Sequence, residues 1–235
     1  MAERPIFVPV LDGPMLVKTH YVEFEWFPGM SVSQKQKSVD SLHLAARKLR
    51  GIESVLEVSS KSREEIGIGL SAFNLSFQTL RYQFTLCVEC AYQGSKVFES
   101  GGPYIDLYGV TAREAKRDER LRSSGRLTSF RFCGIEWPLE PQTAFYDWLY
   151  VNALKKNPEV IDQLTSYSAF TDIEFNPEKS INCQAYSVAL FVSLFHRGLL
   201  DSAQTKDSFL QTISGTIISN SRQDGDIQRG FDSMI

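Results

Sequence analysis

The sequence predicts an α+β fold that is mostly helical and begins with a small antiparallel β element. Two runs rich in β-branched and aromatic residues, 6–10 and 17–27, predict the β element, because the turn signal Asp12-Gly13-Pro14 separates them. Apolar residues at helical spacing predict helices over 33–49, 87–98, 111–117, 141–154, 157–164 and 182–200. With 235 residues, 43% of them hydrophobic, the chain can bury a sizeable core.

The chain is expected to form one domain over residues 1–203, followed by a polar tail over 204–235. Beyond Ser202 the composition changes to Ser, Gln, Asp, Thr and Gly, which favours disorder in part of the tail, in particular over 220–235. Residues 209–218 retain enough apolar character for a short docked helix.

The net charge of −3 argues against a protein that holds duplex nucleic acid by overall charge. It leaves room for a small phosphate-bearing ligand or a single extruded nucleotide, which need only a local basic patch. The sequence has no apolar run long enough to span a membrane and no secretory signal at its N-terminus. We therefore expect a cytoplasmic protein without a membrane partner.

The elements have local start and stop signals. Ser31 or Ser33 is a candidate N-cap for the first helix, and Gly51 follows its last turn. Basic residues line that helix. They form either a face exposed to solvent or a contact with nucleic acid. Thr111 and Glu114 fit a capping box, and Pro141 suits the first turn of a helix.

Later in the chain, the sequence signals for strands are weaker. Residues 55–59 and 130–137 are expected to form strands, the second ending at Pro138. Aromatic residues of the second N-terminal strand, Tyr21, Phe24 and Trp26, are candidates for a stacking platform, although such residues more often belong to a core.

The stretch 87–98 is the most informative part of the sequence. If it is helical, Glu89, Gln93 and Lys96 lie at i, i+4 and i+7 on one face, while apolar residues surround the rest. Burying charge is costly unless the groups are paired or face a cavity. The stretch is therefore either a structural Glu–Lys network or the wall of a pocket that carries a general acid/base and an amine.

The four cysteines, Cys87, Cys90, Cys133 and Cys183, are expected to be free thiols in a reducing compartment. The first two form a Cys-x-x-Cys pair, but zinc would need two more ligands and the other cysteines stand singly. We expect buried structural cysteines, no metal and no cofactor.

The pattern Glu-x-x-Tyr-Gln-x-x-Lys over 89–96 resembles the Glu-His-x-x-Gln-Ala-x-Lys-Phe core of the NADAR (YbiA-like) family. Glu, Gln and Lys keep the family spacing, whereas Cys90 replaces the family His and Gly94 replaces its Ala. The resemblance implies a YbiA-like (NADAR) fold.

Three further segments resemble the family in the same order, so that the resemblance covers roughly residues 67–200. Leu70-Ser71-Ala72-Phe73 is similar to the family's Phe-Ser-Asn-Phe motif, with Asn74 as a candidate for the missing Asn. Thr111-Ala-Arg-Glu-Ala-Lys-Arg117 resembles its Ser-Pro-x-Glu-Ala-Lys-Arg helix. In the apolar helix near the C-terminus, Asn182 or Gln184 is a candidate for a family Asn.

The extra N-terminal strands and the variant core resemble the NADAR branch found as antitoxin beside DarT-type DNA ADP-ribosyltransferases. The resemblance implies an N-glycosidase, a hydrolase that removes ADP-ribose from ADP-ribosylated guanine in DNA, with ADP-ribose as product and a DarT-type toxin as candidate partner. It implies Glu89 and Lys96 as catalytic residues. The implied substrate-binding residues are Ser71, Phe73, Asn74, Tyr92, Gln93, Lys116, Arg117 and Gln184.

Elementary chemistry agrees with these roles. A ribosyl N-glycoside needs an acid at the leaving nitrogen and a nucleophile at the anomeric carbon. Glu89 is the candidate acid, and a desolvated Lys96 is the candidate amine for a Schiff base. Lys116 and Arg117 would suit a diphosphate, with a solvated charged face as the alternative. Two other functions stay open: a non-catalytic module that binds ADP-ribose or the toxin, and a glycosidase of a riboflavin-pathway intermediate.

Overall fold

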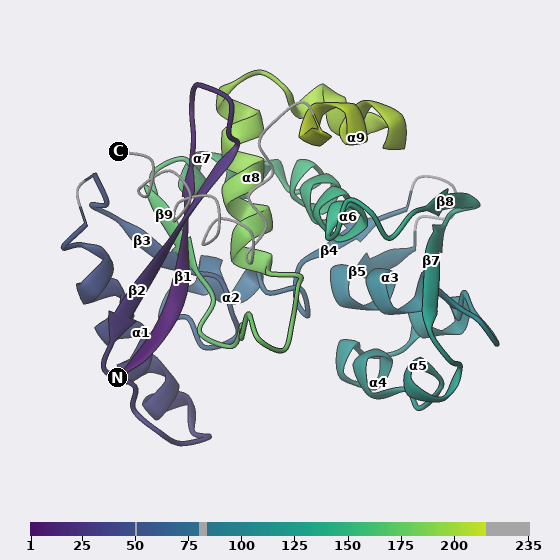
Figure 1. The fold of residues 1–235 in the computed structure, drawn as a ribbon, viewed down its shortest axis with the longest axis horizontal. Helices are drawn as coiled ribbons and strands as arrows, with labels where there is room; N and C mark the ends of the chain where they lie inside the picture. The colour runs from purple at the N-terminus through teal and green to yellow at the C-terminus, as the bar shows by residue number, and fades with distance from the viewer. Residues whose placement is uncertain (50, 80–83, 215–235) are drawn as a thin grey trace, which may run out of the picture. The chain divides into compact units, whose positions relative to one another are not determined.

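The computed structural model describes residues 1–49, 51–79 and 84–214, and the chain divides into two compact units (Figure 1). Unit 1 combines Met1–Ser71 with the chain from Glu159 onward, and unit 2 is Ala72–Pro158. Helices, 3-10 turns included, make up about 42% of the described residues and strands about 20%. The α+β class is confirmed, but the expected predominance of helix is not. Within the described ranges, no helix has the length and apolar character needed to cross a bilayer.

Unit 1 is built on a four-stranded sheet with the order β2-β1-β9-β3. Its elements are β1 (Ala2–Pro9), β2 (Val17–Phe24), α1 (Val32–Ala46), β3 (Val55–Glu57), α2 (Glu65–Gly69), α7 (Ile161–Leu164), β9 (Ala169–Thr171), α8 (Gln184–His196), the 3-10 turn η3 (Leu200–Gln204) and α9 (Lys206–Ser214). The predicted antiparallel pair is confirmed, because β1 pairs with β2 in antiparallel register. The short strand β9 was not predicted; it pairs antiparallel with β1 and parallel with β3.

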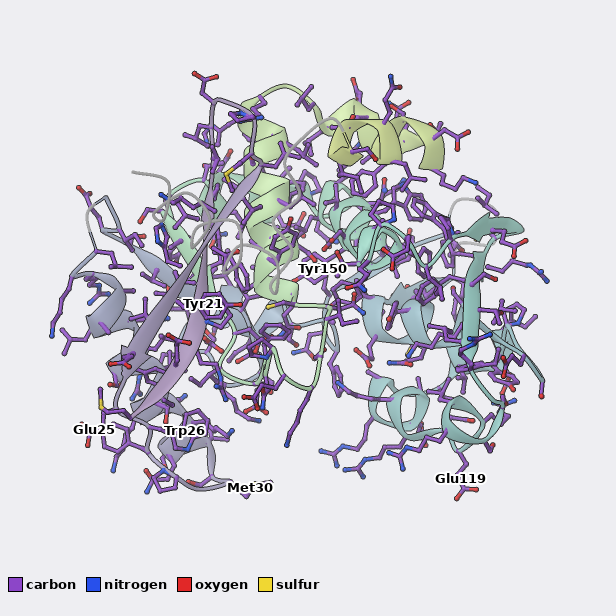
Figure 2. The ribbon with its side chains drawn as sticks, in the orientation of Figure 1. Tyr21, Glu25, Trp26, Met30, Glu119 and Tyr150 are labelled. Carbon is purple, nitrogen blue, oxygen red and sulfur yellow. The ribbon has the colours of Figure 1, made fainter. Side chains whose placement is uncertain are left out.

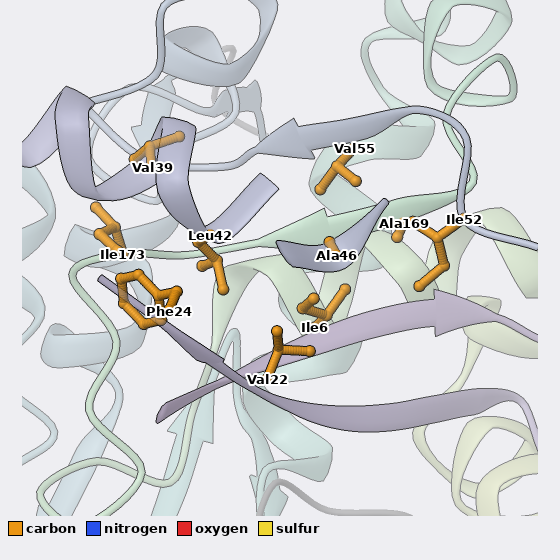
Figure 3. Packing of buried hydrophobic residues seen from close by; sticks show 10 residues of the cluster. All are labelled: Ile6, Val22, Phe24, Val39, Leu42, Ala46, Ile52, Val55, Ala169 and Ile173. Atoms are coloured by element: carbon orange, nitrogen blue, oxygen red, sulfur yellow. The ribbon is translucent and has the colours of Figure 1, made fainter. Parts of the chain in front are cut away.

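Helices α1 and α8 cover opposite faces of this sheet. Ser31 caps α1 by accepting a hydrogen bond from the backbone N of Gln34, as predicted. Ile6 packs toward α1, whereas its neighbour Phe7 meets the ring of Tyr186 on α8 edge-on at 5.6 Å. Successive strand residues point to opposite faces, so the two helices lie on different sides. Figure 3 shows the core beneath α1, formed by Ile6, Val22, Phe24, Val39, Leu42, Ala46, Ile52, Val55, Ala169 and Ile173.

The beginning of the predicted tail is ordered. Helix α9 contains the fully buried Phe209, so the predicted docked helix is confirmed, although it begins three residues earlier than expected. The predicted disorder over 220–235 lies outside the described residues. The proposed boundary at residue 203 remains a prediction.

Unit 2 holds two small antiparallel sheets, β4-β5 and β6-β7-β8. Its elements are β4 (Ser76–Gln78), β5 (Thr85–Cys87), α3 (Val88–Gly94), β6 (Lys96–Phe98), the 3-10 turn η1 (Ile105–Gly109), α4 (Ala112–Arg117), α5 (Arg120–Ser123), β7 (Leu127–Phe132), β8 (Ile135–Trp137) and α6 (Ala144–Lys155). The turn η2 (Pro158–Val160) follows where the chain returns to unit 1.

The prediction of a single helix over 87–98 was wrong at its C-terminal end. Helix α3 ends at Gly94, where a Cβ atom would lie 2.4 Å from the ring of Tyr108. Ser95 then caps the helix, with its Oγ donating to the carbonyl of Ala91 at 2.7 Å. Lys96 begins strand β6 opposite Phe130 of β7. Glu89 and Gln93 therefore share a helix, but Lys96 reaches them from a strand.

The boundaries of other predicted elements differ as well, as two elements of unit 2 illustrate. The expected strand over 130–137 is a hairpin, because Cys133 and Gly134 both take positive φ angles, 48° and 80°, and turn the chain between β7 and β8. Helix α6 begins at Ala144 rather than at Pro141. The capping box of Thr111 and Glu114 at the start of α4 is confirmed.

An aromatic core fixes α3 against the rest of unit 2. The ring of Tyr92 on α3 lies 5.4 Å from that of Phe130 on β7, and Phe130 stacks on Phe145 of α6 at 4.8 Å. Trp137 of β8 lies 4.9 Å from Trp148 of α6. Each aromatic pair contributes about 0.5–1.5 kcal/mol beyond its burial. This packing holds α3, and with it Glu89 and Gln93, against β7 and α6.

Candidate active site

Glu89 is the centre of a polar cluster in unit 2. It lies in the first turn of α3, is only 5% exposed, and its backbone N donates to the carbonyl of Ala72 at 2.9 Å. Its Oε1 accepts a hydrogen bond from Gln93 Nε2 at 2.9 Å and lies 3.8 Å from Lys116 Nζ. The structure thus brings two other predicted site residues, Gln93 of α3 and Lys116 of α4, to the Glu89 carboxylate.

Lys96 is the second ionisable group of this cluster. Its Nζ lies 4.7 Å from the centre of the Tyr92 ring, which holds the amine beside α3 although Lys96 belongs to β6. Burial lowers the pKa of Lys96 to about 8; the Glu89 carboxylate opposes this shift, and the Lys116 charge adds to it. At pH 7 a pKa of this size leaves roughly a tenth of the amine neutral, and the neutral form is the nucleophile.

The amide of Gln93 has one unused group. Because its Nε2 donates to a carboxylate, the orientation of the amide is fixed and Oε1 faces the other way. That oxygen is buried and has no hydrogen-bond partner within the described part of the chain. A buried acceptor without a donor costs about 1–3 kcal/mol. A ligand with an O–H or N–H group at this point would remove that cost.

Phe73 extends the cluster toward solvent. It is 39% exposed, and Lys116 Nζ lies 5.1 Å from the centre of its ring. Arg117, the last residue of α4, and Asn74, which follows Phe73, are both exposed. The predicted hydrogen-bonding role of Asn74 remains a prediction.

Two predicted site residues, Ser71 and Gln184, belong to unit 1. The hydroxyl of Ser71 is buried and has no partner among the described residues. Gln184 donates from Nε2 to the carbonyl of Val58 at 2.6 Å and also hydrogen-bonds Asp172. The amide of Gln184 is therefore engaged inside its own unit.

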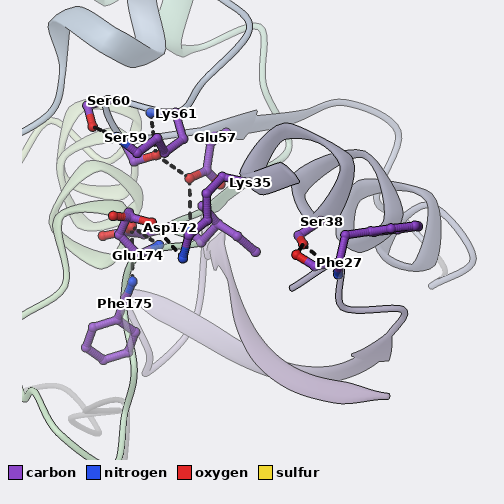
Figure 4. A network of polar contacts seen from close by, with 11 residues as sticks. Phe27, Lys35, Ser38, Glu57, Ser59, Ser60, Lys61, Asp172, Glu174 and Phe175 are labelled. Atoms are coloured by element: carbon purple, nitrogen blue, oxygen red, sulfur yellow. Dashed lines mark hydrogen bonds and ion pairs between the residues drawn. The ribbon is translucent and has the colours of Figure 1, made fainter. Parts of the chain in front are cut away.

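A buried acidic cluster that was not predicted from the sequence lies in unit 1, around Glu57 and Asp172 (Figure 4). Glu57 accepts hydrogen bonds from Ser59 Oγ at 2.6 Å, Thr171 Oγ1 at 2.7 Å and the backbone N of Ile173 at 2.8 Å. Burial, and then the nearby Asp172, raises the pKa of Glu57 to about 8, and burial also raises the pKa of Asp172. The available signal was an acid inside the apolar run Val55-Leu56-Glu57-Val58.

The aromatic residues of the N-terminal strands do not form an open stacking platform. Phe24 belongs to the core of unit 1. Trp26, labelled in Figure 2, already carries two cations, with Lys35 Nζ 4.8 Å and Arg4 Cζ 5.5 Å from its ring. Lys35, one of the basic residues of helix α1, therefore packs on the Trp26 ring.

All four cysteines are free thiols, as predicted. In the described ranges, no group of three or more His, Cys, Asp or Glu side chains is arranged to hold a metal ion. The expectation that the protein needs no metal or cofactor remains a prediction.

Unit 2 thus groups a buried carboxylate, a buried amide and a partly buried amine on an α+β fold, and these polar groups could serve acid–base or nucleophilic chemistry. The model of the family described as DarT1-associated NADAR antitoxin matches residues 2–223, so the chain belongs to this antitoxin family. No curated protein matches the chain.

Proposed function

We propose that the protein is an N-glycosidase that removes ADP-ribose from ADP-ribosylated guanine in DNA, acting in the cytoplasm against a DarT-type toxin. Membership of a DarT1-associated antitoxin family supports the toxin and its product as the targets. The observation that carries the catalytic proposal is the juxtaposition of a buried carboxylate, Glu89, with a largely desolvated amine, Lys96. Binding alone would not require an amine with a lowered pKa.

Each residue has a role that follows from its position. Glu89 takes up the proton that Lys96 releases and gives it to the guanine nitrogen as the bond to the ribose C1′ breaks. The neutral amine of Lys96 forms a bond to C1′, and opening of the ribose ring moves the ammonium proton to the ring oxygen and leaves a Schiff base. Water adds to C1′ of this Schiff base, the C–N bond breaks, and ADP-ribose and the free amine are released.

The neighbouring residues position the substrate. Gln93 holds Glu89 through its Nε2 and offers Oε1 to a hydroxyl or amino hydrogen of the substrate. The cation of Lys116 lies beside Glu89 and the partly exposed ring of Phe73, which suits a diphosphate next to a stacked base. We assign further contacts of ADP-ribose and DNA within unit 2 to Asn74, Tyr92 and Arg117.

Turnover tests this proposal against the binding alternative. An oligonucleotide with one ADP-ribosylated guanine is incubated with a hundredth of its molar amount of protein, and free ADP-ribose is measured. An enzyme releases ADP-ribose from all of the substrate. A binding module protects or retains the oligonucleotide only near equimolar protein, and that result would refute the proposed activity. The riboflavin-pathway alternative predicts release from a small N-glycoside but none from the oligonucleotide.

A further inference from the structure

The proposed chemistry does not use the two cysteines that flank Glu89. Cys87 is the N-cap residue of α3, and its Sγ accepts a hydrogen bond from the backbone N of Cys90 at 3.2 Å. The two cysteines are thus one helical turn apart at the start of α3, with the Cys87 sulfur against the Cys90 backbone. A Cys-x-x-Cys pair in this position is an arrangement in which thiol and disulfide forms can exchange.

Cys87 and Cys90 differ in exposure and in pKa, as thiol–disulfide exchange requires. Cys87 is only partly buried, and the hydrogen bonding of its sulfur by Cys90 lowers its pKa to about 7, against burial and the charge of Glu89. Cys90 is buried, and its pKa is raised by its bond to Cys87, by burial and by the charges of Glu89 and Glu114. Cys87 is therefore the accessible attacking thiol, and Cys90 is the protected partner beside it.

We propose that Cys87 and Cys90 form a thiol-modification site that reacts with a low-molecular-weight disulfide, such as oxidised glutathione. The Cys87 thiolate attacks one sulfur of the small disulfide, and the first glutathione leaves as a thiolate. Cys90 gives up its proton and attacks the Cys87 sulfur of this mixed disulfide, and the second glutathione leaves. The protein loses two protons and two electrons, and one oxidised glutathione becomes two reduced molecules.

Oxidation would change the connection between α3 and α4. In the reduced form, Cys90 Sγ donates to the carbonyl of Val110 at 3.3 Å, and Val110 immediately precedes Thr111, the N-cap of α4. A disulfide has no S–H hydrogen, so this bond is lost. Because α4 carries Lys116 to within 3.8 Å of Glu89, the modification lies next to the candidate active site.

Mass spectrometry of the full-length protein tests the site without any assay of glycosidase activity. The protein is equilibrated in reduced and oxidised glutathione over a range of ratios, quenched with an alkylating agent and digested with trypsin. Cys87 and Cys90 lie in one tryptic peptide that ends at Lys96, apart from Cys133 and Cys183. We expect this peptide to lose two hydrogen masses and escape alkylation, and to regain both thiols in dithiothreitol.

The exposed Cys133 supplies the internal control, because it has no partner cysteine and can form only a mixed disulfide. Cys133→Ser should leave the internal disulfide unchanged, whereas Cys87→Ser and Cys90→Ser should abolish it. The wild-type peptide alone decides the result if a variant misfolds. Full alkylation of Cys87 and Cys90 under conditions that modify Cys133, or a stable glutathione adduct on Cys87, would overturn the proposal.

Discussion

Glu57 of unit 1 and Glu89 of unit 2 are both buried carboxylates, and they differ in whether the surrounding groups are satisfied. In unit 1, Glu57 accepts three hydrogen bonds from its own unit, and Asp172 accepts two from backbone N–H groups. In unit 2, the Glu89 cluster leaves Gln93 Oε1 without a partner in the described residues and keeps a desolvated amine nearby. We therefore expect a site where a buried charge coincides with unused hydrogen-bonding capacity, and not where a charge is merely buried.

Replacement of each carboxylate by an amide is the strongest test of this comparison. Glu89→Gln should lower the rate of ADP-ribose release by about two to four orders of magnitude, because an amide cannot transfer the proton. Glu57→Gln, the matched control in unit 1, should keep wild-type turnover. Circular dichroism checks that both variants fold. Equal losses of activity in the two variants would show that the Glu89 and Glu57 clusters do not differ in their role in activity.

The Glu57 cluster should instead control the pH dependence of stability. A carboxyl whose pKa is raised to about 8 in the folded state stabilises the fold most below its unfolded pKa, and this stabilisation is lost as the pH rises toward 8. Glu57→Gln removes the buried charge and should raise the free energy of unfolding at pH 9 by ~1–4 kcal/mol, with a smaller gain at pH 5.5. Urea unfolding at both pH values measures this difference.

The exposed Glu25 of unit 1, labelled in Figure 2, supplies a control for that experiment. Glu25→Gln should change the free energy of unfolding by less than about 0.5 kcal/mol at either pH. If Glu57→Gln destabilises the protein equally at both pH values, the carboxyl is ionised in the folded state throughout this range.

The charges of Lys116 and Glu89 should shift the pKa of Lys96 in opposite directions, and we expect these effects to be smaller. Removing the cation in Lys116→Gln should raise the pKa of Lys96, and removing the anion in Glu89→Gln should lower it. A carbon-13 NMR titration of the lysine side chains, with Lys96→Arg for assignment, measures the wild-type pKa, which we expect at about 8. An unchanged pKa in both variants would show that neither charge reaches the amine.

Metal removal is expected to have no effect. Dialysis against a chelator should leave the rate of ADP-ribose release unchanged, since the proposed steps use only Glu89, Lys96 and water. A loss of activity that zinc restores would instead assign a catalytic metal to the Cys87 and Cys90 thiols.

Local parts of the site were predictable from the sequence. Glu89 and Gln93 are one helical turn apart, and their predicted proximity appears as a 2.9 Å hydrogen bond. The sequence could not show that the helix ends before Lys96. The close approach of Tyr108 to Gly94 and the pairing of Lys96 with Phe130 depend on tertiary contacts. Charge patterning indicated a basic α4, but only the packing of α3 with α4 selects Lys116 as the cation beside Glu89.

The Glu57 cluster lay beyond sequence reasoning for a similar reason. Its partners Thr171 and Ile173 are more than a hundred residues away along the chain, and the parallel pairing of β3 with β9 brings them together. Strand β9 is too short to show a period of alternation, so neither the strand nor its acidic neighbour could be placed.

Covalent trapping at Lys96 tests the central claim most directly. Borohydride added during turnover of ADP-ribosylated DNA should reduce the Schiff base to a stable adduct, which peptide mapping places on Lys96. Lys116→Arg should still give this adduct. Lys96→Arg keeps a positive charge but cannot form a Schiff base, so it should bind ADP-ribose, yield no adduct and lose hydrolysis. Hydrolysis by Lys96→Arg at a rate comparable to wild type would contradict the account, leaving Lys96 as a binding residue and Glu89 to act with water alone.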